Sequence, residues 1–224
     1  MVNYCAKPKP YFPRMIHVPM KKLFIIAIVF SSIFSSCIKS RDCARTDYSF
    51  EGFFKAYPDR DSIRIGDTIW LETKIPVITK DVVSGKEINY SGAVNLGTAI
   101  RYLELISGLG DPAPLYSANF FNNILVEGRA TASVDENRVR EFLFVEEGGF
   151  YLFKLAIIPT KRGLFAIGPS DAANVYTKSN KCGKSFFSLT FKDTNQRVFL
   201  YEQTRPSYTA SGYERSHIYV FKVY

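Results

Sequence analysis

Histidine and tryptophan are scarce in this chain of 224 residues, which contains two His and one Trp. Only His217 lies outside the first 36 residues, and the four cysteines show no CxxC spacing. Structural metal sites need several Cys or His ligands at such spacings, so we expect no metal and no other cofactor. A Ser–His nucleophile would have to use His217, and no serine stands in a G-x-S-x-G motif. We therefore expect a surface or strand-end histidine and a protein that is not an enzyme.

Acidic residues are absent from residues 1–36, whose five basic residues account for most of the formal net charge of +8. From Cys37 onward, 24 Lys and Arg stand against 21 Asp and Glu, and the basic residues are scattered rather than clustered. Nucleic-acid binding needs a basic patch, so we expect no nucleic-acid partner. The chain also lacks a P-loop and a G-x-G-x-x-G motif, which excludes the usual phosphate-binding loops.

No apolar run reaches the roughly 20 residues that a transmembrane helix needs, because the longest, from Leu23, has about 12. Lys21 and Lys22 precede this run, and small residues follow it up to Ser36. A basic start, a short apolar stretch and small residues are typical of a secretory signal segment, here residues 1–36 with Met20 as the natural start. The alternative is a buried helix at the start of a cytosolic domain.

The segment Ile33-Phe34-Ser35-Ser36-Cys37 resembles the lipobox of bacterial lipoproteins, with Phe34 where that pattern prefers Leu. The resemblance implies cleavage before Cys37, acylation of this cysteine and a membrane partner through the lipid anchor. Ile38 in place of Asp then implies sorting to the outer membrane. Surface-exported lipoproteins of the Bacteroidota often carry an acidic run after the cysteine, and its absence here favours the periplasmic face.

After removal of the signal segment with Cys5, and with Cys37 acylated, Cys43 and Cys182 are the cysteines that remain. An oxidising compartment favours a disulfide between them, and two free thiols are the alternative. We therefore expect a lipidated tether over residues 37–47, followed by a single domain over residues 48–224.

Short apolar segments alternate with turn signals throughout that domain, and no helical period persists. Residues 150–158 and 164–168 flank a five-residue turn that ends in Gly163, which predicts a hairpin. Residues 79–97 are polar and predict a long loop or an edge hairpin, and residues 170–184 are a polar excursion. The predicted strands are residues 49–57, 63–76 with a break at Gly66-Asp67, 99–106, 120–132, 139–145, 150–158, 164–168, 185–191, 197–203 and 218–224. The pattern predicts an all-β protein built as an antiparallel β-sandwich.

Two short patterns, residues 65–71 and 147–153, resemble strand entries of immunoglobulin-like domains. The resemblance implies an immunoglobulin-like sandwich with long loop excursions. Trp70 lies in the first pattern, and we expect it to anchor the core.

Residues 201–215 combine tyrosines and arginines with amide and carboxylate groups, a composition typical of glycan or peptide recognition. The alternative is an ordered loop whose tyrosines pack on the end of the sandwich. The candidate ligand-binding residues are Tyr201, Arg205, Tyr208, Tyr213 and Arg215.

The sequence thus predicts a lipid-anchored cell-envelope protein with a non-catalytic binding or structural role, whose partner is a glycan, a peptide or another envelope protein. The alternative is an envelope hydrolase with an unrecognised active site. That alternative requires His217 to lie within hydrogen-bond reach of an acid and a serine.

Overall fold

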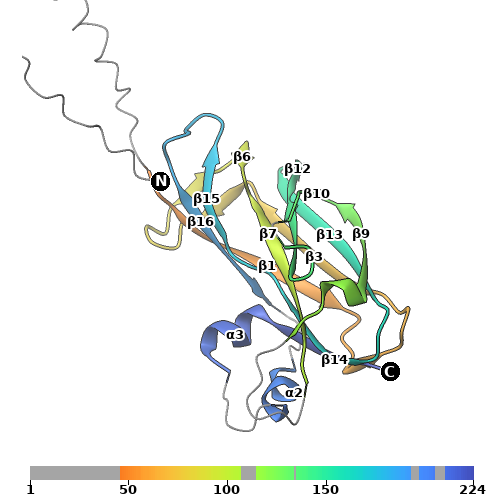
Figure 1. Ribbon diagram of the computed structural model, residues 1–224. Coiled ribbons are helices and arrows are strands. Elements are labelled where there is room, and N and C mark those ends of the chain that lie inside the picture. Colours follow the sequence, from red (N-terminus) through yellow and green to blue (C-terminus); the bar gives the residue numbers. More distant parts are fainter. Residues whose placement is uncertain (1–45, 107–114, 134, 193–196, 205–209) are drawn as a thin grey trace, which may run out of the picture. The chain divides into compact units, whose positions relative to one another are not determined.

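The computed structural model describes residues 46–106, 115–133, 135–192, 197–204 and 210–224, with only the backbone of residues 213 and 214. The chain divides into residues 1–43 and 44–224, and the fold below is that of the second unit. Strands dominate this unit, and its helices are short (Figure 1). The all-β class that the sequence predicts is confirmed.

Two large sheets contain nearly all of the described strands. The first has the order β12-β13-β3-β1-β16-β15-β6, with β9 also paired to β13. Its strands are β1 (Ser49–Tyr57), β3 (Ile69–Pro76), β6 (Ala93–Val94), β9 (Phe121–Glu127), β12 (Val145–Glu147), β13 (Phe150–Pro159), β15 (Ala172–Thr177) and β16 (Ser185–Phe191). We call it the eight-stranded sheet.

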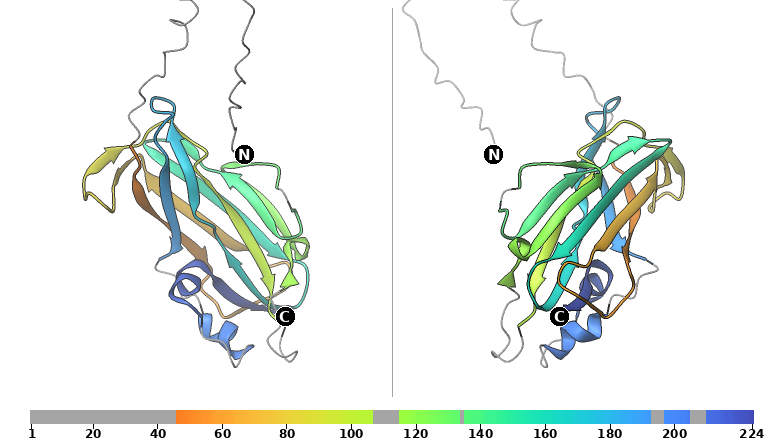
Figure 2. Two further views of the ribbon diagram at one scale, coloured as in Figure 1. Left: turned by 60° about the vertical axis from the view of Figure 1, so that its left-hand side comes forward. Right: turned by 90° about the vertical axis from the view of Figure 1, so that its right-hand side faces the viewer.

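The second sheet has seven strands in the order β10-β11-β7-β14-β17-β2, with β8 also paired to β7. Its strands are β2 (Ser62–Ile63), β7 (Gly97–Glu104), β8 (Leu115–Tyr116), β10 (Arg129–Ala130), β11 (Val139–Leu143), β14 (Gly163–Gly168) and β17 (Tyr219–Val223). A separate hairpin pairs β4 (Ile78–Lys80) with β5 (Glu87–Asn89). The helical segments are η2 (Ala118–Phe120), α2 (Val198–Gln203) and α3 (Gly212–His217), and α2 and α3 lie together at one end of the sheets (Figures 1 and 2).

The strand pairing is mixed rather than purely antiparallel. Most pairs are antiparallel, but β1 runs parallel to β16, and β2 runs parallel to β17. Parallel neighbours need long connections, and here the paired strands lie more than 100 residues apart in the chain. The expected all-antiparallel pairing is therefore wrong at these two pairs.

The expected hairpin over residues 150–168 is also wrong, because its two strands belong to different sheets. β13 pairs with β3, β9 and β12, whereas β14 pairs with β7 and β17. The turn between them therefore carries the chain from one sheet to the other. Both apolar runs then contribute to the common core, one from each sheet.

A helix replaces the strand expected over residues 197–203. Arg197 begins the segment in the left-handed region (φ 50°), and α2 follows. The buried Arg197 guanidinium binds the carboxylates of Asp59 and Asp61, and this fixes the start of the helix against the loop after β1. The hydroxyl of Thr204 donates to the carbonyl of Tyr201 at 2.7 Å at the other end. Six residues are too few for a helical period to be read from the sequence.

Trp70 is not the core anchor that the sequence predicts. Its neighbours Ile69 and Leu71 are fully buried, so alternation along β3 places Trp70 on the opposite, outer face. There it is half-buried and stacks on Tyr57 with ring centroids 6.5 Å apart.

The core is aromatic and receives side chains from both large sheets. Phe153 of β13 lies in its middle, with its ring centroid 5.8 Å from that of Phe54 in the same sheet. The centroid of Phe142, from the other sheet, lies 5.3 Å from Phe153. Edge-to-face and tilted contacts of this kind add to the stabilisation from apolar burial.

Gly168 of β14 provides a direct test of the packing between this strand and the last segment of the chain. A Cβ atom at Gly168 would lie 2.1 Å from the backbone carbonyl oxygen of His217, so Gly168→Ala requires the backbone to move. We expect this variant to lose roughly 1–3 kcal/mol of unfolding free energy in denaturant titrations. A Cβ at Gly212 meets nothing within 4 Å, so Gly212→Ala should change stability by less than about 0.5 kcal/mol. Equal losses in the two variants would contradict this packing.

Candidate functional site

The outer face of the eight-stranded sheet carries a set of polar and aromatic side chains that strand register brings together. Along β1, β3 and β13 every second residue is buried, including Phe54, Thr73 and Phe153. The residues between them point outward because side chains alternate along a strand. The outward set comprises Phe53, Lys55, Glu72, Lys74, Leu152 and Lys154.

A row of alternating charge crosses four strands of this face. Lys55 lies opposite Glu72, Glu72 lies opposite Lys154, and Lys154 lies opposite Glu127. The Nζ of Lys154 is 3.7 Å from Oε2 of Glu72, and the Tyr57 hydroxyl donates to the same oxygen at 2.8 Å. Burial, together with this hydrogen bond, raises the pKa of Tyr57, so the phenol remains protonated and donates at neutral pH. Opposite charges in register stabilise the sheet pairing.

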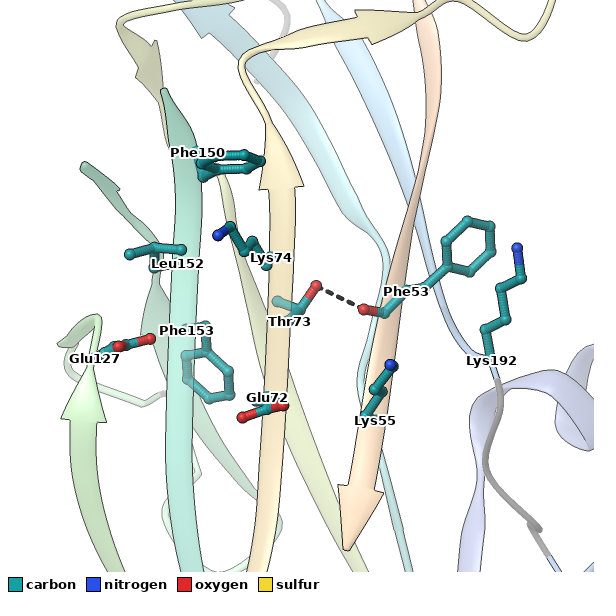
Figure 3. Close-up of a pocket in the computed structure, with 10 residues that line it drawn as sticks. All are labelled: Phe53, Lys55, Glu72, Thr73, Lys74, Glu127, Phe150, Leu152, Phe153 and Lys192. Carbon is teal, nitrogen blue, oxygen red and sulfur yellow. Dashed lines mark hydrogen bonds between the residues drawn. The ribbon is translucent and has the colours of Figure 1, made fainter. Parts of the chain in front are cut away.

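Aromatic rings flank the charged row, and lysines lie over them. The Nζ of Lys74 is 4.0 Å from the ring centroid of Phe150, and that of Lys192 is 4.7 Å from the ring centroid of Phe53. Figure 3 shows Lys74 close to Phe150 and Lys192 beside Phe53, on either side of the face. Cation–π contacts of this kind hold the lysines at the ring faces and keep their charges at the surface.

These side chains line a groove of about 650 Å³, which we call the outer-face groove (Figure 3). Phe53 is 39 % exposed at its edge, and Lys55 and Lys74 are exposed. Neither lysine forms an ion pair with a residue that the structure describes. The groove therefore offers ring faces and cationic donors to a ligand, within the size range of small-molecule sites.

Among the residues expected to bind a ligand, Tyr201 and Arg215 have described side chains. Tyr201 is 3 % exposed and belongs to a small buried cluster with Ile218 and Val220. The Arg215 guanidinium binds the carboxylate of Glu202, and its Nε donates to the carbonyl of Ala210 at 3.1 Å. The structure thus joins α2 to α3 through these residues.

The side chains of the other three expected ligand-binding residues are not described by the structure. Arg205 and Tyr208 lie outside the described residues, and for Tyr213 the structure describes only its place in α3. Binding by the five residues together stays a prediction. The outer-face groove was missed at the sequence level because its residues come from strands whose pairing the sequence does not reveal.

Of the cysteines that carry the lipid and disulfide predictions, Cys37 and Cys43 lie outside the described residues. Cys182 lies in the loop between β15 and β16, where its N–H donates to Oδ1 of Asn180 at 3.2 Å. Nδ2 of Asn180 in turn donates to Oγ1 of Thr46 at 2.9 Å. This loop therefore contacts the chain three residues after Cys43.

His217 is buried rather than at the surface, and it lies within hydrogen-bond reach of a serine and an acid. Its Nδ1 is 2.8 Å from Oγ of Ser216, and its Nε2 is 3.2 Å from Oδ1 of Asp171. Asp171 also accepts the N–H of Leu189 at 2.8 Å, and the Ser216 hydroxyl donates to the carbonyl of Gly212 at 3.3 Å. These contacts tie α3 to β16 and to the residue before β15.

The arrangement contains a serine, a histidine and an aspartate joined by hydrogen bonds. A cavity of about 200 Å³ next to Asp171 is lined by neither Ser216 nor His217. The contacts therefore support a structural role for His217.

The described residues contain neither a candidate metal site nor a candidate membrane-spanning helix. No group of three or more His, Cys, Asp or Glu among them could hold a metal ion. None of the helices in the described ranges is long and apolar enough to cross a membrane.

Comparisons with known proteins do not place this chain in a family. The chain matches no model of a protein family, no curated protein and no solved structure. The class of the protein therefore rests on its own fold: an all-β protein whose two large mixed sheets share one aromatic core.

We predict that Ser216 does not react with a fluorophosphonate ester, because its hydroxyl donates to the carbonyl of Gly212 and the cavity next to Asp171 is not lined by it. Intact-mass spectrometry after incubation measures the reaction, and a known serine hydrolase serves as the positive control. A mass increase that Ser216→Ala abolishes would contradict the structural role and favour the hydrolase alternative.

Proposed function

We propose that this chain is a lipid-anchored cell-envelope protein that binds its ligand, without catalysis, in the outer-face groove. The signal segment and the lipobox-like sequence ending at Cys37 support the anchor. The folded unit begins a few residues later, with β1 at Ser49, so a short tether joins it to that cysteine. Ile38 and the lack of an acidic run support the periplasmic face of the outer membrane.

The fold that we propose is an elaborated immunoglobulin-like sandwich. Two sheets with one shared core support this assignment. The Tyr151 hydroxyl donates to the backbone carbonyl of Tyr90 at 2.7 Å, which joins β13 to the segment between β5 and β6. The parallel pairs β1–β16 and β2–β17 and the helices α2 and α3 are then additions to the basic arrangement.

The ligand class that best fits the groove is an acidic glycan. The observation that carries this proposal is the pairing of exposed lysines with ring faces, Lys74 with Phe150 and Lys192 with Phe53. A sugar ring can pack against the exposed part of Phe53 while its carboxylate or sulfate binds Lys55 or Lys74. An acidic peptide could use the lysines, but it would not need flat rings beside each of them.

A disulfide between Cys43 and Cys182 would fasten the tether to the domain. The contact of Asn180 with Thr46 supports it, because three residues of chain span at most about 11 Å. The N–H of Lys184 also donates to Asp47, at 2.9 Å, so two further residues join these segments. A link closing so long a loop contributes on the order of 4–5 kcal/mol in the chain-entropy model.

The hydrolase stays as a second candidate because Ser216, His217 and Asp171 are connected by hydrogen bonds. It predicts covalent labelling of Ser216, whereas the binding function predicts none.

Mass spectrometry of the native protein tests the anchor and the disulfide together. We expect the mature N-terminus to be an acylated Cys37, and a non-reducing digest to contain Cys43 linked to Cys182. A protein that begins at or before Met20 and lacks acyl groups would overturn the envelope assignment.

Titration with defined oligosaccharides tests the groove. We expect a sulfated or carboxylated oligosaccharide to bind, a neutral one of equal length to bind far more weakly, and the affinity to fall with added salt. The double variant Lys55→Ala and Lys74→Ala should weaken binding by about tenfold or more, since one charge-assisted hydrogen bond contributes roughly 1.5–3 kcal/mol. Isothermal calorimetry measures both effects.

The matched control is Lys161→Ala. This lysine also lies over a phenylalanine, 4.1 Å from the ring centroid of Phe120, but it binds Glu104 of the other sheet. We expect it to leave the affinity unchanged. Equal losses in the control and in the double variant, or none in either, would rule out the groove as the site.

A further inference from the structure

The turn between β4 and β5 holds two valines in solvent. Val83 is 82 % exposed, and Val82 beside it is 55 % exposed. Ile78, at the start of the same hairpin, is also exposed. Adjacent apolar side chains at the tip of a turn bury little surface in the folded domain, and such patches mark contact sites.

Hydrogen bonds hold the turn that presents these valines. The carboxylate of Asp81 accepts the N–H of Ser84 at 2.8 Å and the N–H of Ser49 at 2.9 Å. Hydrogen bonds from Ser84 and then Ser49 lower the pKa of Asp81 to about 2, so the carboxylate is charged at neutral pH. The N–H of Val82 also donates to the carbonyl of Ser49 at 2.7 Å. The valines are therefore fixed beside the first residues of β1.

Exposed lysines lie in the same hairpin as the valines and in a loop that adjoins it. They come from the β4–β5 hairpin and from the neighbouring loop between β15 and β16, and they are Lys80, Lys86, Lys178, Lys181 and Lys184. None of the five forms an ion pair with a residue in the described part of the chain. A cavity lined by Asn89 and Asn180 shows that the hairpin and the loop adjoin. The acidic residues Asp47, Asp81 and Glu87 lie in the same segments, and two of these carboxylates accept backbone N–H groups.

The tether leaves the domain at this same end. Thr46 is the first described residue, and its hydroxyl accepts a hydrogen bond from Asn180 of the loop between β15 and β16. Cys37 precedes Thr46 by nine residues, and a fully extended chain of that length spans about 32 Å at most. Acyl chains on Cys37 would therefore hold this end of the domain close to the bilayer.

We propose that the β4–β5 turn is a membrane-contact surface, at which Val82 and Val83 enter the interface of an anionic phospholipid bilayer while Lys80 and Lys86 of the same hairpin bind the headgroups. Apolar side chains with a basic surround bind such interfaces, and each lysine near an anionic surface adds affinity. This inference rests on the lipid anchor of the proposed function but is independent of the outer-face groove.

Depth-dependent quenching of a single tryptophan tests the contact. In the full chain, matured and acylated in a bacterial host, Trp70→Phe removes the lone tryptophan and Val83→Trp places one at the turn. The matched control carries Phe199→Trp instead, at a 50 % exposed position of α2, at the other end of the domain (Figure 1). Both proteins are reconstituted into phosphatidylglycerol-containing vesicles whose acyl chains are brominated.

We expect the bromine atoms to quench the tryptophan in the β4–β5 turn severalfold more than the tryptophan in α2. Adding Lys80→Glu with Lys86→Glu to the Val83→Trp protein should reduce the quenching, whereas adding Lys161→Glu should not. Quenching at the turn no stronger than that in α2, in protein that floats with the vesicles, would overturn the membrane contact. Acylation is checked by mass before each measurement, so loss of the anchor is recognised separately as failure of the proposed function.

Discussion

The alternation of side chains along β1, β3 and the first half of β13 is the constraint on which the rest of the structure depends. One face of these strands supplies Phe54, Leu71 and Phe153 to the core, all of them fully buried. The opposite face carries the charged row and the rings of the outer-face groove. A shift of one residue in register would exchange the two sets, so fold and proposed binding site are specified together.

The two proposed contact surfaces adjoin on the molecule. A cavity lined by Phe53 of the groove and by Lys80 and Val82 of the β4–β5 hairpin lies between them. A ligand in the groove would therefore be held near the bilayer by the same lysine-rich end that receives the tether. Lipid anchor, membrane contact and recognition of an acidic glycan then form one physical account, in which exposed lysines bind anionic groups and exposed apolar surface supplies the remaining contacts.

Much of the secondary structure could be predicted from the sequence, but the partners of the strands could not. Residues 49–57 and 185–191 coincide with β1 and β16 because their apolar alternation is local. Their parallel pairing, the change of sheet between β13 and β14, and the helix over Val198–Gln203 depend on tertiary contacts instead. The groove could not be predicted for the same reason, since Lys55, Glu72 and Lys154 become neighbours only through register. Ligand binding by residues 201–215 was predicted from their composition alone. Composition does not reveal that Tyr201 is buried.

Equilibrium unfolding of two neighbouring variants tests the division between the two faces of the sheet most directly. Phe153→Ala removes a ring from the core and should cost about 3–5 kcal/mol of unfolding free energy. Phe150→Ala removes a half-buried ring from the outer face of the same strand and should cost less than about 1 kcal/mol. Similar losses for the two variants would contradict the account, because the outer ring would then serve the fold rather than a ligand.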